Sequence, residues 1–215
     1  MKPCLRPPLA LYIHVPLCAS KCAYCDFYSL PRSCADLPSQ DSLVEALLAR
    51  TRSALELYLP GPRPSLETLY IGGGTPTALD PAPFHRLLSG LASMVGPCRE
   101  WTLEANPESL DEAHLDIALE AGVGRISLGV QSLDDSLLRR LGRPADSRTA
   151  LQALERATAR PGLRVSADLI AGLPRSLPLE EEASRLLDAG IEHLSLYDLT
   201  IEDATPLAAQ VREGR

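Results

Sequence analysis

Three closely spaced cysteines are the residues of this chain best suited to chemistry. Cys18, Cys22 and Cys25 form the pattern C-x3-C-x2-C directly after an apolar segment. Three thiolates can bind three irons of a [4Fe–4S] cube, and protein-held cubes usually have four cysteine ligands. Because no fourth cysteine lies within the loop, one iron would stay open to a substrate or cofactor. Reductive cleavage of S-adenosylmethionine (SAM) requires such an open iron on a low-potential cluster.

Zinc is the alternative occupant of these cysteines. A structural zinc site usually has four ligands, and His14 is the only imidazole near the loop. His14 lies in a strand-like segment, where a histidine is more often a hydrogen-bonded core residue than a ligand. Cys4, Cys34 and Cys98 lack spacing partners, so we interpret them as incidental thiols. The pattern favours an iron–sulfur cluster over zinc.

The composition limits the class of protein. The chain has 215 residues, 45% of them hydrophobic, which suits one domain with a substantial core. A net charge of −7 argues against a nucleic-acid partner. No apolar run approaches the roughly 20 residues that cross a bilayer, and residues 1–8 are too short and proline-rich for a secretory signal. Six cysteines without such a signal indicate a reducing, cytoplasmic location.

Short apolar segments alternate with helical patterns along the chain. The segments lack strict alternation, which is typical of strands buried on both faces. Six β–α units predict a parallel sheet with right-handed crossovers, and hence an α/β fold, a partial (β/α)6 TIM-like barrel over residues 1–215. The predicted strands are residues 9–15, 68–71, 101–103, 125–130, 164–170 and 193–199. The predicted helix starts are Asp41, Asp80, a capping-box pattern at Ser109, Asp146, Pro178 and Thr205.

The least generic residues follow the carboxyl ends of these strands, which form the active face of a β/α barrel. The glycines of residues 72–74 could make a simple turn, or could let the backbone approach a ligand and donate N–H groups. Glu104 could be a solvated carboxylate, whereas Asp168 lies in an apolar strand and needs a partner. Gln131 and Arg143 would each be unremarkable alone. All these residues follow the carboxyl ends of predicted strands. This shared position argues that packing alone does not explain why these residue types occur there.

Two motifs together resemble a known family. Residues 12–29, with the three cysteines, and residues 71–77, Ile-Gly-Gly-Gly-Thr-Pro-Thr, are similar to the radical SAM proteins of the oxygen-independent coproporphyrinogen III oxidase group. Residues 102–107, 125–132, 168–174 and 194–202 continue the match in order, so that it covers nearly the whole chain. The departures are Leu17 for a usual phenylalanine, Ala171 for a usual aromatic, and Arg175-Ser176 where a glutamine is common.

The resemblance implies a set of cofactors and ligands. Cys18, Cys22 and Cys25 would bind a [4Fe–4S] cluster, SAM would bind beside it, and haem is a further expected ligand. Gly73, Gly74 and Thr75 would contact the methionine end of SAM through backbone and hydroxyl. The complete set of residues that the resemblance places at SAM or at a second ligand is Tyr12, Tyr24, Gly73, Gly74, Thr75, Glu104, Gln131, Arg143, Asp168 and Thr200.

The family has two main branches. One decarboxylates coproporphyrinogen III to protoporphyrinogen IX, and the other comprises HemW-type haem chaperones. Decarboxylating members usually carry a cysteine where this chain has Phe27, and a long arm before the cluster strand, whereas 11 residues precede Tyr12 here. Glu-Ala-Asn-Pro, in place of an Asp-Pro version, also favours the chaperone branch. The third alternative is a phosphate-binding barrel with a zinc site and no radical chemistry.

The resemblance also implies partners. A haem chaperone would handle haem or a porphyrinogen, need a reducing electron donor and make transient contact with membrane-bound haem acceptors. If the chain is catalytic, its class would be an oxidoreductase acting on coproporphyrinogen III. Family members continue beyond the position of Arg215 into a part that carries a haem-binding His-Asn region. We therefore expect this chain to hold the SAM-binding half alone.

Overall fold

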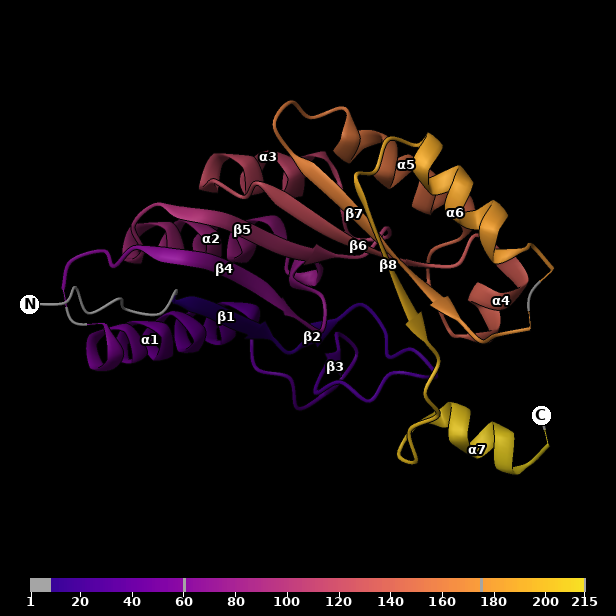
Figure 1. Cartoon of the computed structure of the whole chain (residues 1–215). Coiled ribbons are helices and arrows are strands. Elements are labelled where there is room, and N and C mark those ends of the chain that lie inside the picture. The colour runs from indigo at the N-terminus through magenta and orange to yellow at the C-terminus, as the bar shows by residue number, and fades with distance from the viewer. Residues whose placement is uncertain (1–8, 60, 175, 215) are drawn as a thin grey trace, which may run out of the picture.

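A computed structural model describes residues 9–59, 61–174 and 176–214. Six parallel strands form one curved sheet whose order follows the chain, and within the described residues β1 and β8 are its two edges (Figure 1). The sheet is therefore an open, partial TIM-like barrel, as the sequence predicts. Its strands are β1 (Ala10–Val15), β4 (Leu66–Gly73), β5 (Cys98–Ala105), β6 (Arg125–Gln131), β7 (Arg164–Ala171) and β8 (His193–Asp198).

Helices surround the outside of this sheet, and α7 stands apart beyond the end of β8 (Figure 1). Asp80, Asp146, Pro178 and Thr205 occupy the N-cap positions of α2, α5, α6 and α7, as predicted. The helices are α1 (Gln40–Tyr58), α2 (Pro81–Met94), α3 (Glu112–Ala121), α4 (Asp135–Arg140), α5 (Ser147–Thr158), α6 (Leu179–Asp188) and α7 (Pro206–Arg212).

Two predicted helix caps are wrong. Ser39, not Asp41, is the N-cap of α1, and its side chain accepts a hydrogen bond from the amide of Ser42. Asp111, not Ser109, is the N-cap of α3 and accepts from the amide of His114. Ser109 is unable to cap because its hydroxyl pairs with that of Thr77 at 2.7 Å.

The core lies between the sheet and the helices. Leu69 and Ile71 of β4 and Leu103 of β5 are fully buried on this side, against Phe84 and Leu88 of α2. Because side chains alternate along a strand, the neighbouring residues point to the inner face of the barrel. On the middle strands the serine and threonine side chains of that face are buried, and its carboxylates are partly exposed. These strands are therefore largely buried on both faces, as predicted, but apolar on one face only.

Short elements complete the fold around the cysteines. β2 (Leu17–Cys18) and β3 (Leu30–Pro31) pair with each other and close the cysteine loop at its base. A 3-10 turn (Pro76–Ala78) follows β4. These pieces and α4 are too short to produce a periodicity in the sequence, and were not predicted.

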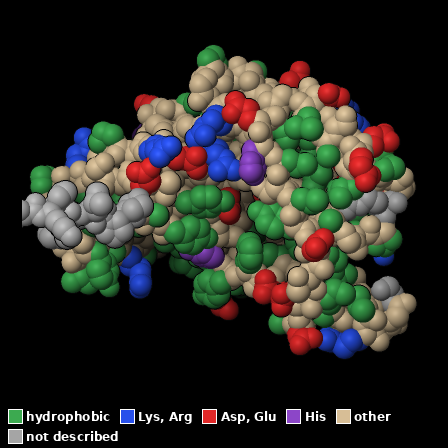
Figure 2. Space-filling view, viewed as in Figure 1, with side chains coloured by type: hydrophobic (Ala, Val, Ile, Leu, Met, Phe, Trp, Pro, Cys, Tyr) green, Lys and Arg blue, Asp and Glu red, His purple; other side chains and the backbone are tan. Residues whose placement is uncertain are grey.

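The surface has no field of a single charge on the face that Figure 2 shows. Acidic and basic side chains are interspersed there, and hydrophobic side chains flank a hollow (Figure 2). Glu100 illustrates the mixing, since it pairs with Arg125 at 3.4 Å and Arg164 at 2.8 Å. No helix within the described ranges is long and apolar enough to cross a membrane. Cys4 and Arg175 lie outside the described residues.

Candidate functional site

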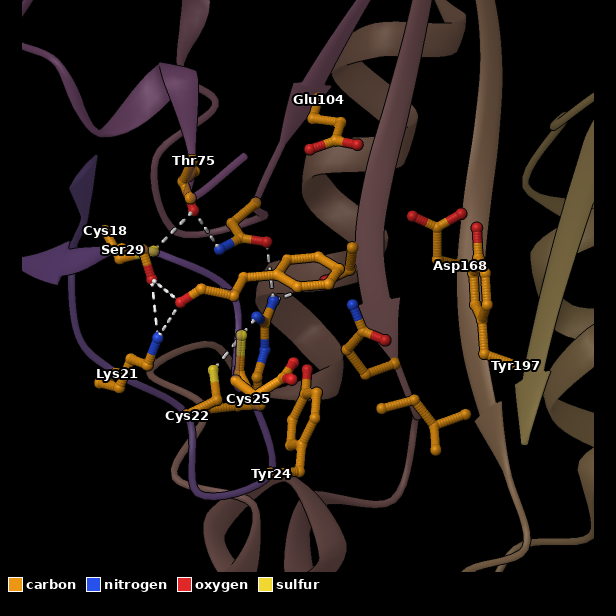
Figure 3. A pocket seen from close by; sticks show the side chains of 18 of the residues that line it. Cys18, Lys21, Cys22, Tyr24, Cys25, Ser29, Thr75, Glu104, Asp168 and Tyr197 are labelled. Carbon is orange, nitrogen blue, oxygen red and sulfur yellow. Dashed lines mark hydrogen bonds between the residues drawn. The ribbon is translucent and has the colours of Figure 1, made fainter. Parts of the chain in front are cut away.

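A cavity of about 350 Å³ opens at the carboxyl ends of the strands, where the barrel fold predicts it (Figure 3). Its volume lies within the range of small-molecule sites. The structure places Tyr12 outside the cavity, half-exposed on edge strand β1. All the other predicted residues line it: Cys18, Cys22, Tyr24, Cys25, Gly73, Gly74, Thr75, Glu104, Gln131, Arg143, Asp168 and Thr200.

Two side chains hold the end of the cysteine loop. Lys21, the only lysine within the described residues, donates from Nζ to the carbonyl of Phe27 and, at 3.1 Å, to Ser29 Oγ. His14 Nε2 lies 2.8 Å from the carbonyl of Tyr28, which can only accept, so this nitrogen is the donor. The neighbouring carbonyls of the loop exit are therefore each held by a nitrogen donor.

The middle of the loop is anchored through its backbone. The amide of Ala23 donates to the carbonyl of Leu141, just after α4, at 2.9 Å. The carbonyl of Ala23 accepts from the amide of Leu207 in α7 at 2.8 Å. Ala23 lies between Cys22 and Cys25, so elements far along the chain fix the loop that carries the thiols.

The N–H groups of the glycine loop donate hydrogen bonds to other parts of the protein. Gly73 has a φ of +112°, which favours glycine, and its amide donates to Glu104 Oε2 at 3.0 Å. The amides of Gly74 and Thr75 donate to the carbonyls of Val15 and Leu17 at 2.9 and 2.6 Å. All three donors therefore have partners within the protein, and a contact between these N–H groups and a ligand stays a prediction. The loop offers a surface without Cβ atoms.

Two cysteine sulfurs accept hydrogen bonds. Thr75 Oγ1 donates to Cys18 Sγ at 3.7 Å, and Arg143 Nη1 donates to Cys22 Sγ at 3.7 Å. Burial raises the pKa of the Cys25 thiol, while the Phe27 amide and the charge of Lys21 act to lower it. Arg143 is 8% exposed and also lies 4.0 Å from Glu108 Oε2. Donors aimed at sulfur suit cysteines that carry negative charge.

The shape around the cysteines fits a cluster. A Cβ on Gly74 would lie 3.0 Å from Cys18 Sγ and 2.5 Å from the carbonyl oxygen of Leu17, so only glycine leaves this space open. Within the described residues, no three His, Cys, Asp or Glu side chains surround one point as a single metal ion requires. The three thiols instead line one cavity, which suits a larger iron–sulfur group with thiolate ligands.

Two carboxylates lie on the inner wall of the barrel. Tyr70 Oη donates to Glu104 Oε1 at 2.7 Å, and Ser127 Oγ donates to Asp168 Oδ1 at 3.3 Å. Burial raises the pKa of Glu104, and these hydrogen bonds from Tyr70 and Gly73 only partly oppose it. Burial likewise raises the pKa of Asp168, against hydrogen bonds from serine hydroxyls. The wall can therefore bind a cation or share a proton with a ligand.

The last residue of β6 is strained where the strand meets the cavity. Gln131 has a φ of +70° and stands at a register shift between β6 and β7. Such a conformation costs of order 1–3 kcal/mol for a residue other than glycine. The fully buried carboxylate of Glu182 supports the next residues, since it accepts from Ser132 Oγ and, at 2.7 Å, from the amide of Leu133. α6 thus anchors the backbone that directly follows Gln131.

The sequence interpretation missed one residue that joins the others. Asn106 lines the cavity and bridges Thr75 and Arg143 with its side-chain amide. The sequence signal for Asn106 is its place in Leu-Glu-Ala-Asn-Pro at the end of a predicted strand. In that segment only Glu104 is predicted from the sequence as a ligand contact. Ser127, Gly129 and Tyr197 also line the cavity and were not selected.

Comparisons with known proteins agree with this geometry. A family model described as the radical SAM superfamily matches residues 12–187. Radical S-adenosyl methionine domain-containing protein 1, mitochondrial, of Mus musculus is 39% identical over 95% of this chain and 46% of its own length. Heme chaperone HemW of Bacillus subtilis is 34% identical over 95% of this chain and 54% of its own length. The chain spans about half the length of these relatives.

A solved structure supports the same assignment. Coproporphyrinogen III oxidase (HemN) of Escherichia coli, described as a radical SAM enzyme, superposes with a TM-score of 0.79 and 26% identity. The match covers 95% of this chain and 47% of that one. The resemblance inferred from the cysteine and glycine motifs is confirmed by the family model, these relatives and the shared fold. The chain therefore belongs to the radical SAM superfamily.

Proposed function

We propose that this chain binds a [4Fe–4S] cluster and SAM and serves haem metabolism as a haem chaperone. The observation that carries the proposal is the meeting of three cysteines from one loop with the glycine loop and the polar strand ends around one cavity. The similarity to a HemW haem chaperone supports the haem role. Phe27, which stands where decarboxylating members carry a cysteine, favours the chaperone over the oxidase.

The proposed roles follow from the contacts. Cys18, Cys22 and Cys25 would hold the cluster, which when bound supplies the open iron and the electron for SAM cleavage. Gly73 and Gly74 would let the methionine end of SAM approach the backbone closely. Gln131 and Thr200 line the same cavity and would contact the rest of SAM.

The two wall carboxylates and one phenol complete the proposed site. Glu104 and Asp168 would attract the cationic groups of SAM or of a second ligand, because a partly buried carboxylate gains from a neighbouring positive charge. Tyr24 lines the cavity beside the cysteines, and burial raises the pKa of its phenol. It would therefore stay neutral and present a flat apolar face to the ligand.

Coproporphyrinogen III oxidase activity is the second candidate. The superposition on the Escherichia coli coproporphyrinogen III oxidase favours it, because it covers 95% of this chain. Either function would require haem or a porphyrinogen as partner and an external reductant for the cluster. A cytoplasmic location stays a prediction, since three relatives carry a mitochondrial name.

Anaerobic iron–sulfur reconstitution followed by EPR of the dithionite-reduced protein tests the cofactor part. We expect a [4Fe–4S]+ signal that changes shape when SAM is added, and that disappears in Cys22→Ala. Cys34→Ala is the matched control, because Cys34 lies outside the set of cavity residues. A signal that is indifferent to SAM, or that survives in Cys22→Ala, would contradict the proposal.

The haem part needs a separate measurement. We expect the protein that includes the family's C-terminal haem-binding part to give a saturating shift of the Soret absorbance in a haem titration. Anaerobic incubation of its cluster-loaded form with coproporphyrinogen III, SAM and a reductant should yield no protoporphyrinogen IX. Formation of protoporphyrinogen IX would instead establish the oxidase. Absence of both haem binding and product would refute the role in haem metabolism.

A further inference from the structure

We propose that Asn106 is a positioning residue that directs hydrogen bonds onto two cluster cysteines and thereby raises the reduction potential of the cluster. The proposal rests on the cluster-binding part of the proposed function. It concerns the side chain that joins Thr75 to Arg143, to which the family resemblance assigns no role.

A continuous chain of hydrogen bonds crosses the cavity (Figure 3). Its centre is Asn106, whose Nδ2 donates to Thr75 Oγ1 at 2.9 Å and whose Oδ1 accepts from Arg143 Nη2 at 3.1 Å. At the two ends, Thr75 Oγ1 donates to Cys18 Sγ and Arg143 Nη1 donates to Cys22 Sγ, each at 3.7 Å. One amide therefore links the donors of two different sulfurs.

The chemistry of the partners fixes the orientation of the amide. A guanidinium has donors only, so the oxygen of Asn106 must face Arg143 and its nitrogen must face Thr75. The Thr75 hydroxyl has a single proton, and its oxygen already accepts from the amide. That proton is therefore left for Cys18 Sγ.

An aspartate at this position would reverse the outcome. A carboxylate only accepts hydrogen bonds, so Thr75 would turn its proton away from Cys18 towards the carboxylate. The sulfur would lose its donor, while the bond from Arg143 would persist. The difference between asparagine and aspartate thus controls whether one cluster ligand accepts a hydrogen bond.

The surroundings leave the amide little freedom. A Cβ on Gly129 would fall 2.7 Å from Asn106 Oδ1, so the backbone of β6 packs closely against it. Arg143 is further fixed by a hydrogen bond of 2.5 Å to the carbonyl of Gly129. Hydrogen bonds to the sulfurs help to set the reduction potential of an iron–sulfur cluster. This rigid series of hydrogen bonds therefore favours the reduced cluster, which carries more negative charge.

The test is a comparison of reduction potentials in reconstituted protein. Mediated redox titrations followed by EPR are applied to the wild type, Asn106→Asp, Thr75→Val, Thr75→Ser and the double variant Asn106→Asp with Thr75→Val. We expect Asn106→Asp and Thr75→Val each to lower the equilibrium constant for reduction about tenfold, which is about 59 mV for one electron. Thr75→Ser keeps the hydroxyl and should retain the wild-type potential.

The double variant separates the hydrogen bond from the added charge. If Asn106→Asp acts by redirecting the Thr75 proton, it should change the potential little in the Thr75→Val background. An equal drop in both backgrounds would mean a through-space effect of the charge and would overturn the proposal. Equal potentials for Thr75→Val and Thr75→Ser would overturn it as well, even if Asn106→Asp fails to fold.

The failure of this inference is distinguishable from that of the proposed function. Iron and sulfide content and the EPR signal of the wild type are measured first. A wild type without a cluster refutes the proposed function and this inference with it. A wild type with a cluster, together with unchanged potentials in the variants, refutes the role of Asn106 alone.

Discussion

Replacing Gly74 with alanine should damage the fold and the cysteine site together. The new Cβ would lie 2.5 Å from the carbonyl oxygen of Leu17, a backbone atom that cannot rotate away, and 3.0 Å from Cys18 Sγ. Overpacking of this kind costs about 1–3 kcal/mol. The displaced Leu17 carbonyl also accepts from the amide of Thr75 at 2.6 Å, and losing that bond adds about 1 kcal/mol. The expected loss is about 2–4 kcal/mol.

Urea unfolding of the protein without cluster, followed by circular dichroism, measures this loss. The expected loss of unfolding free energy in Gly74→Ala is a large share of the roughly 5–15 kcal/mol that stabilises a typical domain. Gly124→Ala is the matched control, because a Cβ there meets nothing within 4 Å and should be neutral or stabilise the fold by about 0.4–1 kcal/mol. Iron content after reconstitution should fall in Gly74→Ala only. Equal urea midpoints and equal iron content in the two variants would refute the reasoning.

Three further predictions concern buried charge. The pKa of Glu104 is raised in the folded state, so this carboxyl's contribution to stability is present below its ordinary pKa of 4.5 and is lost as pH rises through the folded-state pKa. The unfolding free energy of Glu104→Gln relative to wild type should therefore increase from about pH 4 to pH 7. A difference that does not change with pH would contradict this prediction. Arg143→Met should cost about 3 kcal/mol in urea unfolding, since it removes the hydrogen bonds of a buried guanidinium to Asn106 and to the carbonyl of Gly129 and leaves the partly buried Glu108 carboxylate without its neighbouring cation; a loss below about 1 kcal/mol would argue against these contacts. Hydrogen bonds from Ser136 and Ser176 hold the pKa of Asp134 well below its usual 3.8. Because a hydrogen bond to a charged group contributes about 1 kcal/mol more than one to a neutral group, Asp134→Asn should lower the unfolding free energy by about 1 kcal/mol at neutral pH. Thermal unfolding should show this difference from wild type shrinking as pH falls below about 4; a difference that grows in acid would contradict the prediction.

The strands were predictable because burial and periodicity act locally. Each predicted segment became a strand of the sheet, with bounds that moved by a few residues, as for β4 (Leu66–Gly73). Cap residues were less predictable, since the hydroxyl of Ser109 has another partner across the fold in Thr77. Local sequence contains no information about such a competitor.

The site was predictable where a residue type carries its own chemistry. The cysteines, the glycines and Asp168 were selected for that reason, and the structure brings them to one cavity. Asn106 was not selected because an amide has no distinctive chemistry until its two neighbours are known. The engagement of the glycine-loop N–H groups likewise depends on Glu104, on Val15 of β1 and on Leu17 of β2, which the fold brings beside the loop.

The hydrogen-bond donors to the two cysteine sulfurs also have a consequence for synthesis of the chain. The donors to Cys18 and Cys22 lie 57 and 121 residues later in the sequence. At a translation rate of about 5–20 residues per second, the second donor is made about 6–24 seconds after its cysteine. During that interval the nascent thiols lack their hydrogen-bond donors and are open to oxidants and stray metal ions. We therefore expect a cluster bound by these cysteines to lack the hydrogen bond from Arg143 until that residue has joined the fold.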